Sequence, residues 1–130
     1  MNIFSQKHRL LHSIKKKNEF SIHSPYMFDL YNRLIKKHKR NPIRLIHLFQ
    51  EEFGEKNIIL ISSSYDEFQA IQTVLIEKSI IIIDKPYQCK DSYNEFLKII
   101  SDPRRIVIID LFKIVIIFQN SKLSPQKYRF

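Results

Sequence analysis

The chain has 130 residues, enough for one domain and too few for two, and its apolar content of 44% excludes a disordered protein. The single cysteine, Cys89, excludes an internal disulfide bond, and aliphatic runs of four residues fall far short of the roughly 20 that cross a membrane. These features predict a cytoplasmic protein without a membrane span. The net charge is +9, which raises the question of an anionic partner.

This charge is concentrated near the N-terminus. Residues 1–45 hold 11 Lys and Arg but only two acidic residues, whereas residues 46–130 hold 11 basic and 11 acidic residues. We call residues 1–45 the basic arm. Such an arm attracts polyanions, and the alternative interpretation is a solvated helical face.

The first 54 residues are predicted to be helical. Residues 2–17 carry apolar side chains at helical spacing and end in three lysines, which suit a helix C-terminus. Ser24-Pro25 and Asn41-Pro42 are start signals for a second and a third helix. Gly54, the only glycine, is typical of a helix C-terminal cap.

From Asn57 onward the pattern changes to strands and helices in alternation. The stretches 57–62 and 79–84 are almost continuously apolar, which predicts two strands buried on both faces. Between them, Ser64 and Glu67 form a capping box that opens a helix running to about Lys78. Strand, helix and strand at this spacing predict a parallel pair with a right-handed crossover.

The rest of the chain predicts one more helix and two strands. Asp91 or Ser92 caps the helix, Asp102-Pro103 ends it, and residues 105–111 and 114–118 form a hairpin. We therefore predict an α/β fold with a small, mostly parallel sheet of about four strands. Residues 1–54 would be a basic helical region and residues 55–130 the sheet region of a single domain. A second copy of the chain is predicted to cover an exposed sheet edge.

Two stretches resemble a group of bacterial class I S-adenosylmethionine-dependent methyltransferases, the O-methyltransferase-like group. Ile22 to Tyr31 (IHSPYMFDLY) is similar to a stretch near the N-terminus of that group. The second stretch runs from the strand ending in Asp84, through a helix and Asp102-Pro103, to IIDLF at residues 108–112, a short apolar strand and Gln126-Lys127-Tyr128. It resembles the group's last two structural units. The resemblance implies a Rossmann-like, methyltransferase-derived fold and S-adenosylmethionine as the cofactor.

The chain departs from the group where the cofactor would bind. The turn after the first strand, Leu60 to Ser64, lacks the glycines that allow close approach of a cofactor, and acidic Asp66 and Glu67 follow it. The resemblance implies an acidic residue, Ile and His after Asp84, where this chain has Lys85-Pro86-Tyr87. We therefore predict a catalytically degenerate protein, with no catalytic residue, metal or cofactor, that acts as a binding or assembly module.

Two alternatives stay open. In the first, the protein still binds S-adenosylmethionine or a nucleotide in the crevice at the carboxyl ends of the strands. Asp84 follows the turn after the first strand by about 20 residues in the sequence, which is the spacing of a ribose-binding carboxylate. The residues of this crevice are Ser62, Ser63, Ser64, Asp84, Lys85 and Tyr87. In the second, the basic arm binds nucleic acid, which salt-dependent retention on heparin would reveal. Its residues are Lys15, Lys16, Lys17, Lys36, Lys37, Lys39 and Arg40.

Other residues are weaker candidates. His8 and His12 have a spacing that can hold a metal, but no third ligand lies nearby in the sequence. The aromatic residues of the basic arm could stack on bases, although their helical positions favour core packing; they are Phe4, Phe20, Tyr26 and Tyr31. Asp110 lies in a strand, and we expect it to face solvent or to meet Arg104, Arg105 or Lys113.

Overall fold

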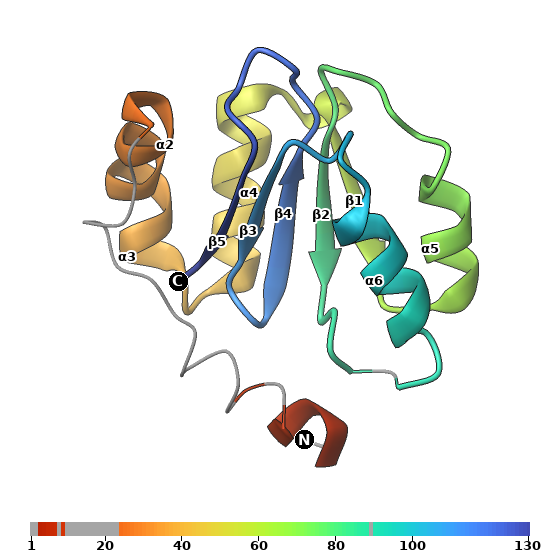
Figure 1. Ribbon diagram of the computed structural model, residues 1–130. Helices are drawn as coiled ribbons and strands as arrows, with labels where there is room; N and C mark the ends of the chain where they lie inside the picture. Colours follow the sequence, from red (N-terminus) through yellow and green to blue (C-terminus); the bar gives the residue numbers. More distant parts are fainter. Residues whose placement is uncertain (1–2, 8, 10–23, 89) are drawn as a thin grey trace.

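The computed structural model describes residues 3–7, 9, 24–88 and 90–130. One five-stranded sheet lies between two layers of helices (Figure 1). The helices α2 to α4 cover one face of the sheet, and α5 and α6 cover the other (Figure 1). The strands are β1 (Ile58–Ser62), β2 (Ile80–Asp84), β3 (Val107–Asp110), β4 (Ile114–Phe118) and β5 (Gln126–Arg129). The predicted α/β class is thus confirmed.

The sheet is mixed rather than mostly parallel. Its order is β1-β2-β4-β3-β5, with β1–β2 and β3–β5 parallel and β4 antiparallel to both of its neighbours. The parallel pair and the closing hairpin are confirmed, because the short link after β3 returns β4 alongside it. The count of about four strands is corrected to five. The fifth strand is the polar segment 126–129, which lies at one edge of the sheet. Of its residues, Tyr128 alone is buried.

The second predicted helix begins at the expected cap. Helix α2 (Pro25–Leu30) continues through a π-helical turn, η2 (Tyr31–Ile35), into α3 (Lys36–His38). The Ser24 Oγ accepts the Met27 N–H at 3.3 Å, so Ser24 is the N-cap of α2. Of the helix predicted over residues 2–17, residues 3–7 and 9 are described and helical, and the others lie outside the described residues.

Helix α4 (Pro42–Phe53) also has the predicted ends. The Asn41 Oδ1 accepts the Arg44 N–H at 3.2 Å, and Gly54 adopts a φ of +89° after the last turn. A short 3₁₀ turn, η3 (Glu55–Asn57), then leads into β1. Because α2, η2 and α4 share one hydrophobic cluster with β2, β3 and β4, the regions before and after residue 54 share a core.

The helix after β1 is shorter than predicted. Helix α5 (Tyr65–Ile71) ends seven residues before Lys78. The guanidinium of buried Arg105 donates to the carbonyl oxygens of Ile71 and Val74, both at 2.7 Å. These hydrogen bonds satisfy carbonyl groups at and just beyond the end of the helix, so the chain turns away there. Helix α6 (Tyr93–Ser101) ends before Asp102, as predicted.

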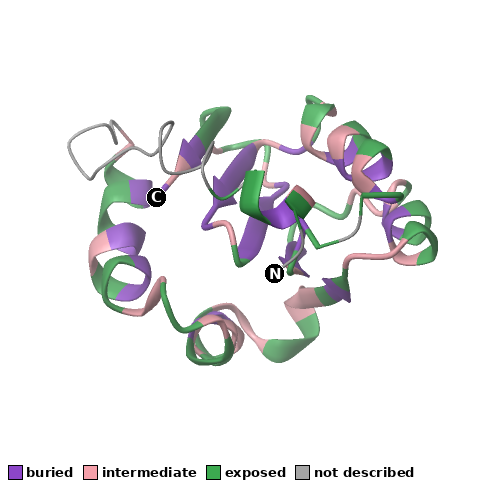
Figure 2. Cartoon of the chain, turned by 90° about the horizontal axis from the view of Figure 1, so that it is seen from below, coloured by how far each residue is buried: buried purple, intermediate pink, exposed green. Residues whose placement is uncertain are grey.

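Buried residues gather on the strands and on the helix faces turned toward them (Figure 2). Strand β2 is buried on both faces, as predicted, with Ile80 and Ile82 in one cluster and Ile81 and Ile83 in the other. Strand β1 is not, because it lies at the edge and leaves Leu60 half exposed.

Two further expectations concern the surroundings of the protein. Among the helices of the described ranges, none is long and apolar enough to span a membrane. The strand order places β1 and β5 at the edges of the sheet in the described part of the chain. Pairing of a second copy along one of these edges stays a prediction.

Candidate functional site

The six predicted crevice residues lie at the carboxyl edge of the parallel strands, which is the lower edge of the sheet in Figure 1. Strands β1 and β2 end side by side, with Ser62 paired to Asp84 in the strand register. The six residues nevertheless form two separate groups along this edge. The serines lie at the end of β1 and in the turn that leads to α5, and the other three residues lie at the end of β2 and in the segment that follows it.

The turn Ser62–Ser64 is closed by a carboxylate from α5. The Glu67 Oε2 accepts hydrogen bonds from the Ser62 and Ser64 hydroxyl groups and from the Ser62 N–H. In return the Ser64 Oγ accepts the Glu67 N–H at 3.2 Å, which confirms Ser64 as the N-cap of α5. These hydrogen bonds, chiefly that from the Ser62 hydroxyl, lower the pKa of Glu67. The turn therefore carries a negative charge of its own.

The third serine of the turn is held by α6. The Ser63 Oγ lies 3.3 Å from the Oγ of Ser92, which is buried at the start of α6. The hydroxyl groups of all three serines thus have partners within the protein. We infer that the turn is stabilised by the chain itself rather than shaped for a cofactor.

Replacing Glu67 by glutamine is expected to lower the melting temperature at pH 7. A carboxyl whose folded-state pKa is depressed stabilises the fold above its unfolded-state pKa, near 4.5, and that contribution is lost as the pH falls through the folded-state pKa. The difference in melting temperature between wild type and Glu67→Gln should therefore shrink below about pH 4. Thermal unfolding across pH measures this. Asp66→Asn, which leaves these hydrogen bonds in place, is the control, and an equal effect of both substitutions would contradict the assignment.

The segment after β2 lines a cavity of about 470 Å³. Three of the six predicted residues take part in it: Asp84, Lys85 and Tyr87. The same segment adds Gln88, and the N-terminal turn, the start of α4 and the β3–β4 turn contribute the others. The complete lining is Ser5, Arg9, Pro42, Asp84, Lys85, Tyr87, Gln88, Phe112 and Lys113. The serines of the β1–α5 turn are not part of this lining.

Tyr87 is the buried anchor of the cavity wall. Its hydroxyl donates to the Asp110 Oδ2, and its carbonyl oxygen accepts the Ser5 hydroxyl at 2.7 Å. Its ring stacks on Phe112, with centroids 5.6 Å apart and an interplanar angle of 13°. Burial, followed by the charge of Asp110, raises the pKa of Tyr87. Tyr87 therefore stays protonated and acts as a hydrogen-bond donor at neutral pH.

The surroundings of Asp110 differ from the expectation. Asp110 is buried, and it accepts hydrogen bonds from Tyr87 and from the Phe112 N–H at 2.9 Å. Of its expected partners, Arg104 pairs with Asp102 at 2.7 Å and Arg105 is engaged by carbonyl groups on the far side of the fold. Asp110 lies at the end of β3, where the loop after β2 brings a tyrosine hydroxyl to it.

Of the seven residues predicted to bind nucleic acid, the structure describes four. Lys36, Lys37 and Arg40 are exposed around the end of α3, and Lys39 is half-buried. Lys15, Lys16 and Lys17 lie outside the described residues, as do His8, His12, His23 and Cys89. Nucleic-acid binding by the basic arm stays a prediction.

Two aromatic residues of the basic arm pack against other side chains of the protein, as predicted. Tyr31 is buried against Phe130, and Phe4 packs edge-on against Tyr93 with centroids 5.0 Å apart. The core-packing interpretation is wrong for Tyr26, which is 46% exposed because it faces outward from the first turn of α2. Phe20 lies outside the described residues. Within the described ranges, no group of three or more His, Cys, Asp or Glu residues could hold a metal ion.

Sequence reasoning missed several cavity residues. Phe112 and Lys113 could have been found, because the predicted hairpin turns at the edge where β2 ends. No sequence signal points to Arg9 or Pro42, which reach the cavity only through packing of the N-terminal turn and α4. Fold and cavity together define a three-layer α/β protein with an open cavity at the carboxyl edge of its parallel strands. Comparison with known families, curated proteins and solved structures found no match to this chain.

Proposed function

We propose that the protein is a catalytically degenerate, methyltransferase-like protein that lacks the cofactor loop and acts as a binding or assembly module. One observation carries this proposal: the Glu67 carboxylate holds the turn after β1 through hydrogen bonds to Ser62 and Ser64. A cofactor-binding turn would instead leave its backbone N–H groups and a small-residue surface for the ligand.

The link to methyltransferases is itself part of the proposal, and two features support it. The resemblance implies a chain that closes with a strand ending in Asp-Leu-Phe and a final strand, and β3 and β4 form such a pair around Asp110. The resembling N-terminal stretch begins a helix at Ser24, where a cap is found. Strand β5, next to β3 at the edge, holds Gln126, Lys127 and Tyr128, with which the resembling stretch ends.

The residues present do not fit S-adenosylmethionine at the β1–α5 turn. The turn has no glycine, and its Ser62 hydroxyl and N–H already donate to Glu67. The carboxylate group of the cofactor would also meet the negative charges of Asp66 and Glu67 in the first turn of α5.

Calorimetric titration with S-adenosylmethionine and S-adenosylhomocysteine tests the proposal. We expect no heat of binding and no shift of the melting temperature at millimolar ligand, because the turn is occupied by the protein's own carboxylate. A cooperative thermal transition of the same sample is the control for folding. Binding at micromolar affinity would overturn the proposal.

A further inference from the structure

We propose that the cavity at the carboxyl edge binds a small aromatic anion, meaning a planar ring that carries a phosphate or carboxylate group. This inference rests on the proposed function, since it supplies the binding module with a class of ligand. The cavity volume of about 470 Å³ lies within the range of small-molecule sites and is ample for a ring with one anionic group.

The charges around the cavity favour an anion. Arg9, Lys85 and Lys113 line it, and Asp84 is the one acidic residue of the lining. The three cationic residues come from the N-terminal turn, the segment after β2 and the β3–β4 turn. Positive side chains that converge on a concave surface attract and orient an anionic group. Asp84 adds an acceptor for a hydroxyl or amino group of the ligand.

The walls of the cavity favour a planar, apolar group beside that anion. Phe112 and Pro42 line it together with Tyr87, whose ring is stacked on that of Phe112. Aromatic walls pack against planar ligand groups in offset or stacked arrangements. Tyr87 is held at both ends, by Asp110 at its hydroxyl and by Ser5 at its carbonyl oxygen. The wall is therefore arranged before any ligand arrives.

The backbone provides an independent observation. Lys85 and Phe112 have φ values of +51° and +66°, and among the described residues they are the only ones other than glycine with positive φ. Both line the cavity. The left-handed region is unfavourable for long or bulky side chains, and such strain is concentrated at functional sites. The Lys85 N–H donates to the Lys113 carbonyl oxygen at 2.9 Å, which ties the two strained turns together and keeps both lysines at the cavity.

Phenyl phosphate and benzoate are the probes, titrated by calorimetry into the full chain, with phenol and inorganic phosphate as the two half-ligands. We expect at least one aromatic anion to bind saturably and about tenfold more tightly than either half-ligand, with an affinity that falls as salt rises. Lys113→Gln and Lys85→Asn are each expected to weaken binding about five- to tenfold. Asparagine is chosen at position 85 because it tolerates the left-handed backbone.

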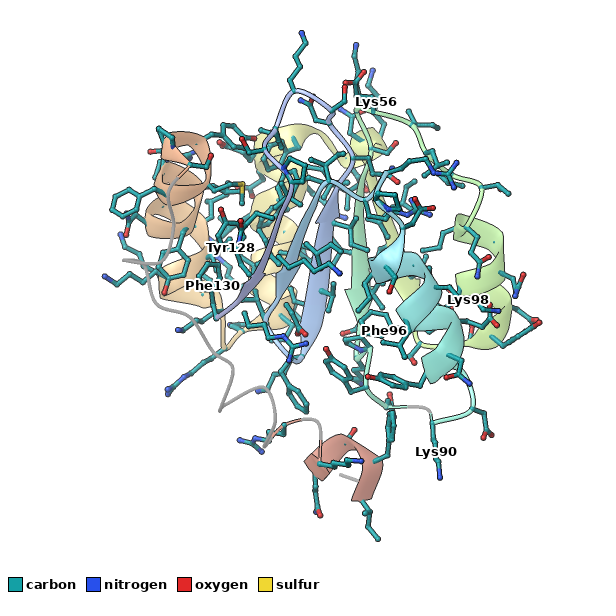
Figure 3. All side chains as sticks on the ribbon, viewed as in Figure 1. Lys56, Lys90, Phe96, Lys98, Tyr128 and Phe130 are labelled. Carbon is teal, nitrogen blue, oxygen red and sulfur yellow. The ribbon has the colours of Figure 1, made fainter. Side chains whose placement is uncertain are left out.

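Lys56→Gln is the matched control, because Lys56 lies at the opposite end of the sheet (Figure 3). It removes the same charge and should leave the affinity unchanged. Equal weakening by all three substitutions would show attraction by net charge alone and would overturn the inference, as would saturable binding that neither Lys85→Asn nor Lys113→Gln alters. Thermal transitions confirm that each variant is folded.

The absence of binding by both aromatic anions at millimolar concentration would also overturn the inference. That result leaves the proposed function untouched, because titration with S-adenosylmethionine decides it separately. Conversely, cofactor binding would overturn the proposed function even if phenyl phosphate bound as expected.

Discussion

Replacing Arg105 by methionine is expected to lower the free energy of unfolding by about 3 kcal/mol. Arg105 is only 3% exposed, and its guanidinium donates to the Gln119 Oε1 and to the carbonyl oxygens of Ile71 and Val74. Methionine fills a similar volume but donates nothing, so the buried acceptors of Ile71 and Gln119 and the half-buried carbonyl oxygen of Val74 lose a charged donor. Burial already lowers the pKa of Arg105, which shows that its desolvation offsets part of the stabilisation.

Urea unfolding of wild type and Arg105→Met measures this loss. The preceding residue offers a matched control, because the Arg104 side chain is 65% exposed and its guanidinium pairs with Asp102. Arg104→Met is expected to leave the free energy of unfolding nearly unchanged, because an exposed ion pair contributes little to stability. Similar effects at the two positions would show that Arg105 does not hold the end of α5.

Replacing Phe49 by alanine is expected to destabilise the protein by about 3–5 kcal/mol. Phe49 is fully buried on α4, and its ring packs with those of Phe53 and Phe118, with centroid distances of 5.5 and 6.3 Å; the latter two rings also contact each other, at 5.8 Å. Alanine removes one of the two α4 rings that pack on Phe118 of β4 and leaves a cavity that the rigid sheet cannot close. Denaturant unfolding measures the loss.

Ile43→Ala is the control on the same helix. Ile43 is 73% exposed, so its truncation should change the free energy of unfolding by no more than about 0.5 kcal/mol. A loss at position 43 as large as that at position 49 would mean that α4 buries a different face than the structure shows.

The cavity could be anticipated only in part, because its residues depend on different levels of structure. Asp84, Lys85 and Tyr87 follow a strand that is evident from its isoleucine run, and a sheet of parallel strands directs attention to their carboxyl ends. The serines of the β1–α5 turn also lie at the carboxyl end of a parallel strand. They fall outside the cavity because Glu67 and Ser92 engage their hydroxyl groups. The positions of the strands in the sequence predict which edge of the sheet carries the cavity, but not which side chains line it.

What the sequence determined by itself is local. The caps at Ser24, Asn41 and Ser64, the terminating Gly54 and the hairpin after Asp110 depend on hydrogen bonds and backbone angles within a few residues. The doubly buried strand β2 follows from four consecutive isoleucines, which only a position inside a sheet can bury on both faces.

Only the tertiary structure decided the features that join distant segments. Helix α5 ends early because Arg105, 34 residues beyond Ile71, takes up its carbonyl group. Asp110 is buried because Tyr87 reaches it with a hydroxyl donor. The polar segment 126–129 becomes a strand because β3 presents an open edge to it. In each case the stabilising free energy comes from contact with a residue or strand far along the chain. A local sequence pattern does not indicate which distant segment will pack against it.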